Sequence, residues 1–267
     1  MARSTRGADY QDVPRPVAAL ADEYPPGHHD PHHHHKRAQL IYACAGVTVV
    51  ITDQASFVVP PQRAVWVPAG VEHEAHMRGH VSIRTLYVDP SAFPDLPTTC
   101  RVIEVSCLLR ELIIEACRIP IVYDLAGRDA LVMKLLMTEL IAMPATPLDV
   151  PMPQDPRLVR VCTAILRDPG QNEPLDGWAH IAGMGRRTFT RTFRRETGVS
   201  FATWRQNIRL MEALSRLAVG QPVTTVAYDV GYNSPSAFTA MFRRAFGRAP
   251  TQYLASIPGA KPPDHHH

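Results

Sequence analysis

Histidines are the residues of this 267-residue chain best able to do chemistry, and they cluster near its start. Six of the thirteen fall within eight residues, at positions 28, 29, 32, 33, 34 and 35. His33 and His35 occupy alternate positions, which in an extended strand lie on one face. Gln39, four residues after His35, keeps that parity. If a neighbouring strand brings His73 to the same face, three imidazoles and an amide oxygen converge.

Such a donor set predicts a site for a divalent transition metal. Mixed nitrogen and oxygen ligands suit Ni, Zn, Fe or Cu and leave coordination positions open for water or an effector. Two other interpretations stay open. The histidine-rich stretch could be a solvated loop that binds metals opportunistically, with His73 serving only its turn. Alternatively, the same pocket could bind an organic effector without a metal.

Arginines form the second chemically capable group, in a stretch that contains one pattern twice. The segment from Phe193 to Gly198 recurs 49 residues later as the segment from Phe242 to Gly247, and an aromatic residue follows each copy. A glycine turn lies upstream of each, at Gly183 and at Gly231. Helix, glycine turn, helix is the plan of a helix-turn-helix unit, whose second helix enters the major groove of DNA.

The second helix of each unit presents a predicted DNA-binding face. At about 100° per residue, the face opposite the aromatic pair Phe189 and Phe193 is cationic, and guanidinium groups make bidentate contacts with guanine or phosphate. A solvated helix face is the plainer interpretation, but this face is cationic or polar in both copies. The first unit carries more arginines and is expected to dominate sequence choice. The candidate DNA-contacting residues are Arg186, Arg187, Thr190, Arg191 and Arg194 in the first unit, and Ser236, Thr239 and Arg243 in the second.

The elements that position these residues follow from apolar periodicity. Residues 38–88 contain short β-branched runs separated by Gly and Pro, which predict the strands of a small barrel or jelly roll. Residues 104–143 change to helical spacing and predict two helices, separated after Pro120. Both helices are more apolar than one barrel-facing side requires. They form either a satellite core against the barrel or a dimer interface, which we favour because operator recognition gains from doubling.

The C-terminal half is expected to be entirely helical. An entry helix is predicted over residues 157–167, and apolar residues recur every three or four positions from Phe201 to Val219, which predicts one helix about 28 Å long. Such a rod would hold the two recognition helices about 34 Å apart, one turn of DNA, so that one chain touches successive major-groove segments. Trp204 and Tyr253 are expected in the core.

Prolines mark the domain boundary. Five of them between Pro144 and Pro156 predict a semi-rigid linker that neither continues a helix nor joins a sheet. The final residues, His265–His267, resemble a fragment of a purification tag. The expected organisation is a mobile arm (1–27), a sensor domain with a helical dimerisation segment (28–143), the linker (144–156), a double helix-turn-helix domain (157–257) and a tail (258–267).

Charge follows the same division. From Asp155 onward, 15 Lys and Arg stand against 8 Asp and Glu, a net charge of +7, whereas residues 1–154 hold 13 against 17, a net charge of −4. A basic half suits a DNA-binding module, since phosphate neutralisation supplies most non-specific affinity. Five scattered cysteines indicate reduced thiols, and no apolar run approaches the roughly 18 residues of a membrane span. The sequence therefore predicts a cytoplasmic protein without a membrane partner.

The C-terminal stretch resembles the paired helix-turn-helix domain of the AraC/XylS transcription regulators, over about 100 residues. The resemblance implies that Arg187, Thr190 and Arg191 meet bases from the first recognition helix, as Ser236 and Thr239 do from the second. Gly185 stands where the family usually has Ser or a similar N-cap, so a weaker first turn is expected there. The motifs that carry the resemblance are residues 186–189, 193–198, 231–238 and 242–247.

The first half resembles the two cupin motifs, through His33-x-His35-x-x-x-Gln39 and Pro68-x-Gly70-x-x-His73. Together with residues 60–68 these motifs are similar to the cupin sensor domain of a subgroup of AraC-type regulators, over about 60 residues. By that resemblance, His33, His35 and His73 are the metal-ligand positions. Gln39 stands where the first motif usually has a carboxylate.

The sequence therefore predicts a one-component transcription regulator without enzymatic activity, of α+β class. A cupin-type β-barrel followed by two helices would sense a metal ion or small molecule, and an all-α domain of two helix-turn-helix units joined by a linker helix would bind an operator. The expected partners are double-stranded operator DNA, the effector, RNA polymerase and a second copy of the chain. The alternatives are a metal-dependent cupin enzyme with an accessory DNA-binding domain, and a metal buffer.

Overall fold

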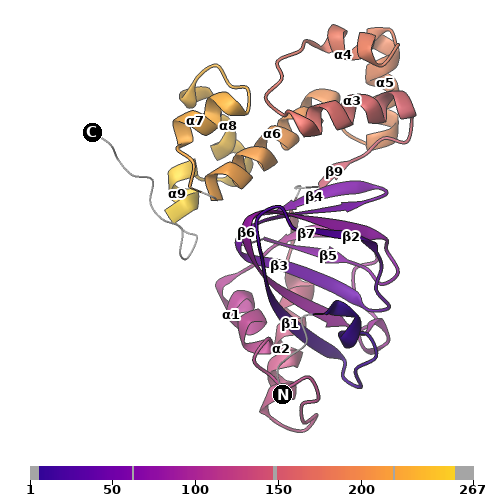
Figure 1. Cartoon of the computed structure of the whole chain (residues 1–267), viewed down its shortest axis with the longest axis vertical. Coiled ribbons are helices and arrows are strands. Elements are labelled where there is room, and N and C mark those ends of the chain that lie inside the picture. Colours follow the sequence, from indigo (N-terminus) through magenta and orange to yellow (C-terminus); the bar gives the residue numbers. More distant parts are fainter. Residues whose placement is uncertain (1–5, 62, 147–148, 219, 256–267) are drawn as a thin grey trace. The chain divides into compact units, whose positions relative to one another are not determined.

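The computed structural model describes residues 6–61, 63–146, 149–218 and 220–255, which form two compact units. The first contains the chain up to Thr52 together with Phe57–Asp149, and the second contains Asp53–Ser56 and the residues from Val150 onward. The first unit is rich in strands and the second is helical (Figure 1), which confirms the predicted α+β class. The predicted tail (258–267) lies outside the described residues.

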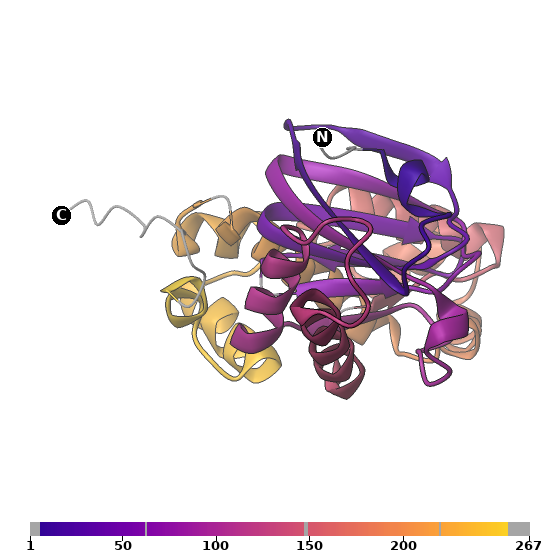
Figure 2. The ribbon, with the colours of Figure 1, turned by 90° about the horizontal axis from the view of Figure 1, so that it is seen from below.

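One curled sheet forms the frame of the first unit (Figures 1 and 2). Its described strands run in the order β1-β6-β3-β5-β7-β8, with β2 beside β6, and β4 beside β3 and β9. The strands are β1 (Val17–Tyr24), β2 (His29–His33), β3 (Ala38–Thr52), β4 (Ala55–Val59), β5 (Arg63–Val67), β6 (His73–Val88), β7 (Arg101–Glu104), β8 (Ala145–Thr146) and β9 (Asp149–Pro151).

Side chains of the long strand β3 alternate between two faces of the sheet, and both faces are buried. Leu40 and Tyr42 belong to the core that the sheet shares with helices α1 and α2. Gln39 and Ile41, between and beside them, line a cavity on the opposite side of the sheet. Because side chains of successive strand residues point to opposite faces, a strand covered on both sides is a continuous buried run, as residues 38–43 of β3 are.

Strand β3 bends at a glycine. The pairing of β3 with β6 shifts register on both sides of Ala45, and Gly46 follows with a φ of 73°. A Cβ built on Gly46 would lie 2.2 Å from the carbonyl oxygen of His80. The position therefore requires glycine both for its left-handed backbone and for the close approach of β6, and the bend joins what the sequence predicts as two separate strands.

Two helices cover the outside of the sheet (Figure 2), α1 (Cys107–Ala116) and α2 (Arg128–Ala142). Both are where the sequence predicts helices. The side chains that reach the core are Leu109, Leu112, Ile113, Met133, Leu136, Met137 and Leu140. The apolar residues of these helices left exposed are Leu108 (49%), Leu131 (68%), Leu135 (45%) and Ile141 (36%), in line with the prediction that both helices are more apolar than one packed side requires. The helix pair thus both packs on the sheet and keeps further apolar residues exposed.

The prediction of a structureless arm over residues 1–27 is wrong for most of its described part. Gly7–Tyr10 forms a short 3-10 helix, η1, and Val17–Tyr24 is strand β1, paired along its whole length with β6. The first four residues of β1 are buried and only its second half alternates with solvent, which is why no clear period of two appears in the sequence. The buried guanidinium of Arg37 holds the connecting segment by donating to the carbonyl oxygens of Gln11, Val13 and Arg15.

The prediction that residues 144–156 cannot join a sheet is also wrong. Strand β8 pairs with β7, and β9 pairs with β4. The prolines are tolerated because these strands are only two and three residues long, and because Pro151 occupies the last position of β9, where the missing N–H costs no central ladder bond. Pro156, assigned to the linker by the sequence, occupies the first position of helix α3, where its missing N–H leaves no intrahelical bond unmade.

The second unit consists of seven described helices, two of which form each half of the repeat. The entry helix and the linker helix lie where the sequence predicts them. The helices are α3 (Pro156–Arg167), α4 (Leu175–Ile181), α5 (Arg186–Thr197), α6 (Phe201–Ala218), α7 (Val223–Asp229), α8 (Pro235–Phe246) and α9 (Pro250–Ala255).

The two copies of the repeat end alike and begin differently. Helix α5 ends at Gly198 and α8 at Gly247, with φ of 75° and 72°, so both use a left-handed glycine cap. Helix α8 begins with Ser234, whose hydroxyl accepts from the N–H of Ala237. Gly185, at the equivalent position of α5, offers no side-chain cap, as the sequence indicates.

Aromatic side chains fill the core of each half. Phe189 and Phe193 pack edge-on against Phe201, and Trp204, fully buried as expected, donates its indole N–H to the carbonyl oxygen of Pro151. Tyr253 packs edge-on against Phe242 in the second half and is 3% exposed, also as expected. All five cysteines are free thiols. Within the described part of the chain, no helix combines the length and the apolar character of a membrane span.

Candidate histidine pocket and nucleic-acid interface

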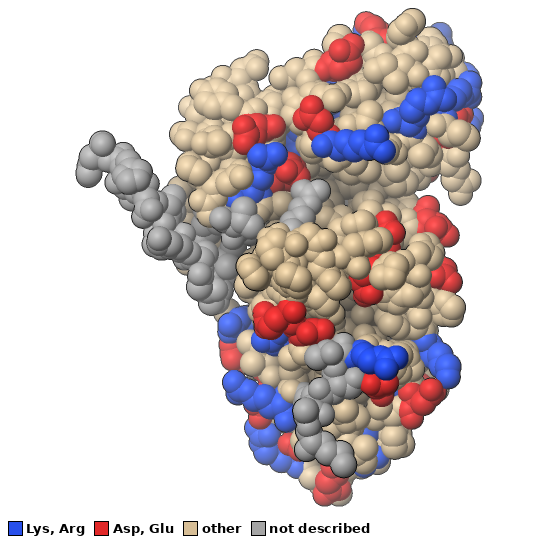
Figure 3. All heavy atoms as spheres, viewed as in Figure 1, with Lys and Arg blue, Asp and Glu red and all other residues tan. Residues whose placement is uncertain are grey.

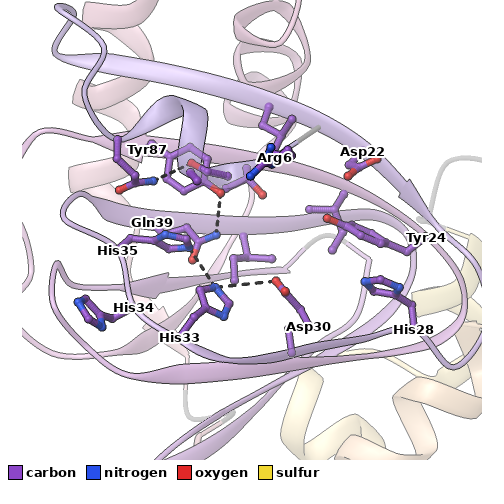
Figure 4. Close-up of a pocket in the computed structure, with 18 of the residues that line it drawn as sticks. Arg6, Asp22, Tyr24, His28, Asp30, His33, His34, His35, Gln39 and Tyr87 are labelled. Atoms are coloured by element: carbon purple, nitrogen blue, oxygen red, sulfur yellow. Dashed lines mark hydrogen bonds and ion pairs between the residues drawn. The ribbon is translucent and has the colours of Figure 1, made fainter. Parts of the chain in front are cut away.

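The inner face of the sheet encloses a cavity of about 660 Å³, lined by β1, β2, β3, β6 and the N-terminal turn. Figure 4 shows His33 between His35 and Asp30, with Tyr24 and His28 at the other end of the cavity. Apolar side chains from the strands also line the cavity, and they are Leu20, Ile41, Met77 and Ile83. The cavity thus combines polar and apolar lining.

The structure brings the three predicted imidazoles together. His33 lies opposite His73 in the pairing of β2 with β6, and opposite residues of an antiparallel pair share a face. The Nε2 atoms of His33 and His35 are 3.1 Å apart, and the ring centroids of His33 and His73 are 4.5 Å apart. One nitrogen of each of the three rings lies within 4.8 Å of the others.

Backbone carbonyls orient two of these rings. The Nδ1 atom of His73 is 2.9 Å from the oxygen of Val71, and that of His33 is 2.6 Å from the oxygen of Pro31. A neutral imidazole that donates from Nδ1 keeps its lone pair on Nε2, and a carbonyl in this role commonly orients metal-binding histidines. The buried Nε2 of His73 has no hydrogen-bond partner among the described residues.

Burial favours the neutral form of His35 and His73. Desolvation lowers the pKa of His35 from 6.5 to about 3, and the neighbouring rings of His33 and His73 lower it further. Desolvation likewise lowers the pKa of His73, against a smaller opposing effect of its hydrogen bond to Val71. Neutral imidazole is the form that binds metals, so the protonation state of the pair suits a ligand role.

Gln39 lines the cavity, but from a different strand than the one predicted. It lies in β3 whereas His35 follows β2, so the prediction of one strand with shared parity is wrong. Its side chain is 7% exposed and donates to the hydroxyl of Tyr87 across 3.5 Å. Its Oε1 is buried without a hydrogen-bond partner in the described chain, and such an atom normally has one.

Two further residues of the cavity, Asp30 and Tyr87, were not predicted as site residues. Asp30 lies 3.8 Å from the Nε2 of His33, and the ring of Tyr10 stacks on that of Tyr87. Alternation along the strands predicted within residues 38–88 could have placed Tyr87 on the inner face. Asp30 and Tyr10 lie in stretches for which the sequence predicts no strand, and nothing in the sequence indicates them.

The second unit presents the arginines of helix α5. Arg187, Arg191 and Arg194 are exposed, and no hydrogen bond or ion pair to the described residues occupies their guanidinium groups. Arg186 is exposed but pairs with Asp176 at 3.1 Å. Thr190 is half-buried on the flank, where its hydroxyl donates to the carbonyl oxygens of Arg186 and Arg187. Three of the five predicted residues are therefore available to an external anion.

Helix α8 offers the smaller set that the sequence predicts. Ser236 and Arg243 are exposed, and Thr239 is half-buried. Arg244, not predicted, is exposed beside Arg243. Figure 3 shows Lys and Arg atoms gathered over the region of α3 and α5 in the second unit.

An arginine of the linker helix α6, not predicted as a functional residue, forms hydrogen bonds to both halves of the repeat. Arg209 donates to the carbonyl oxygens of Pro169 and Gln171, before α4, and to that of Gly231, in the turn of the second half. Its guanidinium also lies over the ring of Tyr232. These contacts fix the two recognition helices relative to one rod.

Two family models match the chain, one in each unit. The model described as "AraC-like ligand binding domain" matches residues 16–140, and that described as "Helix-turn-helix domain" matches residues 178–256. The first covers the sheet from β1 to α2 and the second covers the repeat.

Individual relatives span the same regions. The HTH-type transcriptional regulator NimR of Escherichia coli (strain K12) is 33% identical over 232 residues, 87% of this chain and 85% of NimR. The crystal structure of the DNA-binding domain of AdpA in complex with a target DNA has 33% identity and a TM-score of 0.35, over 36% of this chain and 88% of that one. ToxT from Vibrio cholerae O395 has 12% identity and a TM-score of 0.39, over 91% and 99%.

Proposed function

The chain belongs to the AraC family of helix-turn-helix transcription regulators, with an N-terminal ligand-binding domain and a C-terminal DNA-binding domain, and we propose that it couples occupancy of the histidine pocket to operator binding. A ligand can shift DNA affinity only by binding two arrangements of the protein unequally. The proposal therefore concerns what enters the pocket and which residues meet the operator.

The observation that carries the DNA side of the proposal is the row of unpaired guanidinium groups on α5. Arg187 and Arg191 are one helical turn apart and Arg194 follows after three residues, so the three line one face. Forked donors on a helix that enters the major groove can take guanine O6 and N7, or phosphates, as bidentate acceptors. Ser236 and Thr239 of α8 would contribute a second, weaker set of contacts in the next groove segment.

For the effector we propose a divalent transition metal ion, Ni, Zn, Fe or Cu, held by His33, His35 and His73. The residues fit such an ion, because their ring nitrogens already converge and the Nε2 of His73 and the Oε1 of Gln39 are buried acceptors without partners. A bound ion would supply Lewis acidity and open positions for a further ligand. Burial favours neutral donors at His35 and His73, and backbone carbonyls orient the rings of His33 and His73.

An organic molecule is the second candidate effector. A cavity of about 660 Å³ lies within the range of 300–1,000 Å³ usual for small-molecule sites. Its apolar lining residues would bury a hydrocarbon or aromatic body, while Asp30 and the histidines would hold polar groups. Metal and organic ligand are compatible, since the ion would occupy only the end that contains His35.

We further infer that the chain acts as a homodimer in the cytoplasm, without catalytic activity, and that it reaches RNA polymerase from an operator beside a promoter. The exposed apolar face of α1 and α2, which contains Leu131 and Leu135, supports the dimer. Turnover of a substrate by protein loaded with iron, manganese or nickel would contradict the absence of catalysis and favour the cupin enzyme instead.

An operator titration tests the coupling. The DNA upstream of the gene, labelled with a fluorophore, is titrated with metal-free protein and with protein in the presence of each divalent ion. We expect one ion to change the apparent Kd by about 5-fold to 150-fold, the usual range of allosteric coupling. In the double variant His33→Ala/His35→Ala the metal-free Kd should persist and the response to the ion should vanish.

The same titration separates the alternatives. Operator binding that ignores every ion in the wild-type chain would exclude the metal as effector and leave the organic ligand. Salt-insensitive binding, or no binding to any duplex, would overturn the DNA side of the proposal.

A further inference from the structure

The outer face of the same sheet carries a second group of metal-capable side chains, His29, Glu74 and His76, which the histidine pocket does not include. One ligand atom from each lies within 4.8 Å of the others. Strand β6 alternates here, since His73, Ala75 and Met77 are buried and the residues between them are partly exposed. Glu74 and His76 therefore point away from the cavity, and the sheet separates this group from the pocket.

Backbone pairing brings the third residue to the same place. His29 of β2 lies directly opposite His76 of β6, so their side chains share a face. The N–H of Met77 donates to the carbonyl oxygen of His28 at 2.9 Å, and that of Gly27 donates to the carbonyl oxygen of Met77 at 3.2 Å. Asp30 and Ala75 continue the pairing on the other side of the pair. Ligands on paired strands are held in place before an ion arrives.

The donor separations are those of a small coordination sphere. The Nε2 of His29 is 3.4 Å from one carboxylate oxygen of Glu74, and the Nε2 of His76 is 3.0 Å from the other. Two ligands of a tetrahedral zinc ion, with bonds near 2.0–2.1 Å, are about 3.3 Å apart. The imidazole rings stack with centroids 4.3 Å apart and planes 13° apart, so both present Nε2 to one carboxylate.

We propose that His29, Glu74 and His76 form a second site, for a zinc-like divalent ion, on the outer face of β2 and β6. Two imidazoles and one carboxylate are a common protein ligand set for zinc, and the partial exposure of all three leaves room for water as a fourth ligand. The two sites lie at opposite ends of β2, because His29 pairs at one end and His33, opposite His73, at the other.

An ion bound by His29, Glu74 and His76 would restrain strand β2, which lies at an edge of the sheet. Among the described strands, β2 pairs with β6 alone, and the strand is five residues long. A metal bridge from His29 to His76 would therefore restrain the strand that supplies His33 to the cavity. Restraint of β2 gives the outer site a structural role that does not depend on what the cavity binds.

Zinc stoichiometry tests the proposal in a background where the inner site is removed. All proteins carry His33→Ala and His35→Ala and lack His265–His267, because consecutive histidines at a terminus bind metals themselves. Isothermal titration with Zn²⁺ is expected to give one ion per chain. Adding His29→Ala and His76→Ala should remove that ion.

Two further variants test whether the loss of the zinc ion is specific to His29, Glu74 and His76. The matched control adds His32→Ala and His34→Ala, which removes two exposed histidines that pair with Glu72 on neighbouring positions and should keep the ion. Glu74→Gln retains the shape and the hydrogen-bonding oxygen but loses the charge, and should weaken zinc binding at least 10-fold. Circular dichroism checks that each variant is folded.

The proposal is overturned if the variant without His29 and His76 binds as much Zn²⁺ as the control without His32 and His34. It is also overturned if the background protein itself binds none. Either result would leave the operator coupling proposed for the inner site untouched, since the inner ligands are absent from every protein compared.

Discussion

At the scale of single residues, burial distinguishes two groups of polar side chains that have no hydrogen-bond partner among the described residues. The guanidinium groups of Arg187, Arg191 and Arg194 are exposed, so water satisfies them until a phosphate or base replaces it. The Nε2 of His73 and the Oε1 of Gln39 are buried. A buried polar atom without a partner is costly, which indicates that the pocket is completed by something it binds.

Arg191 is the residue whose removal should be most informative for DNA recognition. Arg191→Ala is expected to weaken specific operator binding by about 1–3 kcal/mol, because a bidentate contact to guanine is worth that much. Fluorescence anisotropy with operator and with random duplex measures the effect. The fold should not change, since the side chain is exposed.

Arg167→Ala is the control for Arg191. It removes one positive charge from an exposed position at the end of α3, outside both recognition helices. It should therefore weaken binding to the operator and to the random duplex slightly and equally. An equal loss on operator and random DNA for Arg191→Ala would mean that Arg191 contacts phosphate and reads no base.

At the scale of elements, the caps of the two recognition helices predict different stabilities. Ser234→Ala should lower the free energy of unfolding of the second unit by about 1 kcal/mol, because it removes the hydroxyl that accepts from the N–H of Ala237. Gly185→Ser should raise it by a few tenths of a kcal/mol, since Gly185 has an extended backbone and space for a Cβ. Urea denaturation measures both. A loss on Gly185→Ser would show that the helix start does not accept a side-chain cap.

The helical elements could be predicted from sequence more fully than the strands. Helices α5 and α8 could be located from three signals: the pattern repeated after 49 residues, the glycine at each helix end and the aromatic pair four residues apart. Each copy of these signals lies within one short segment, so it can be recognised locally. Strands β1, β2 and β7, and the first half of β6, gave no such signal. Their pairing is long-range, and β2 contains mostly histidine with one proline, a composition that carries no apolar period.

The histidine groups could likewise be predicted only in part. His33, His35 and His73 were predicted to meet, and they do, because cross-strand pairing agreed with the motif spacing. The outer group was not predicted, since it needs the register of His29 opposite His76. That register depends on an irregularity between Asp30 and His33, which no local pattern in the sequence specifies.

At the scale of the whole molecule, the two units have different reasons to associate with a second copy. The second unit contains both helices α5 and α8, so one chain holds both predicted recognition helices. The first unit keeps apolar side chains of α1 and α2 in solvent, at a cost of about 25 cal/mol for each Å² left exposed. Burying Leu131 and Leu135 against a second copy would recover that energy and place two DNA-binding units in one particle.

The double variant Leu131→Glu/Leu135→Glu tests this association. Charges on neighbouring turns of α2 would be buried without partners in a dimer, so the variant should sediment as a monomer where the wild-type chain sediments as a dimer. Operator affinity should fall on the order of 100-fold, because the second DNA-binding unit is no longer held nearby, while affinity for a fragment long enough for one chain stays the same. Ile181→Glu, which places the same charge at an exposed apolar position of α4, should leave the sedimentation coefficient unchanged. If the double variant keeps the dimer mass, the apolar face of α2 serves another contact and the dimer, where present, is formed elsewhere.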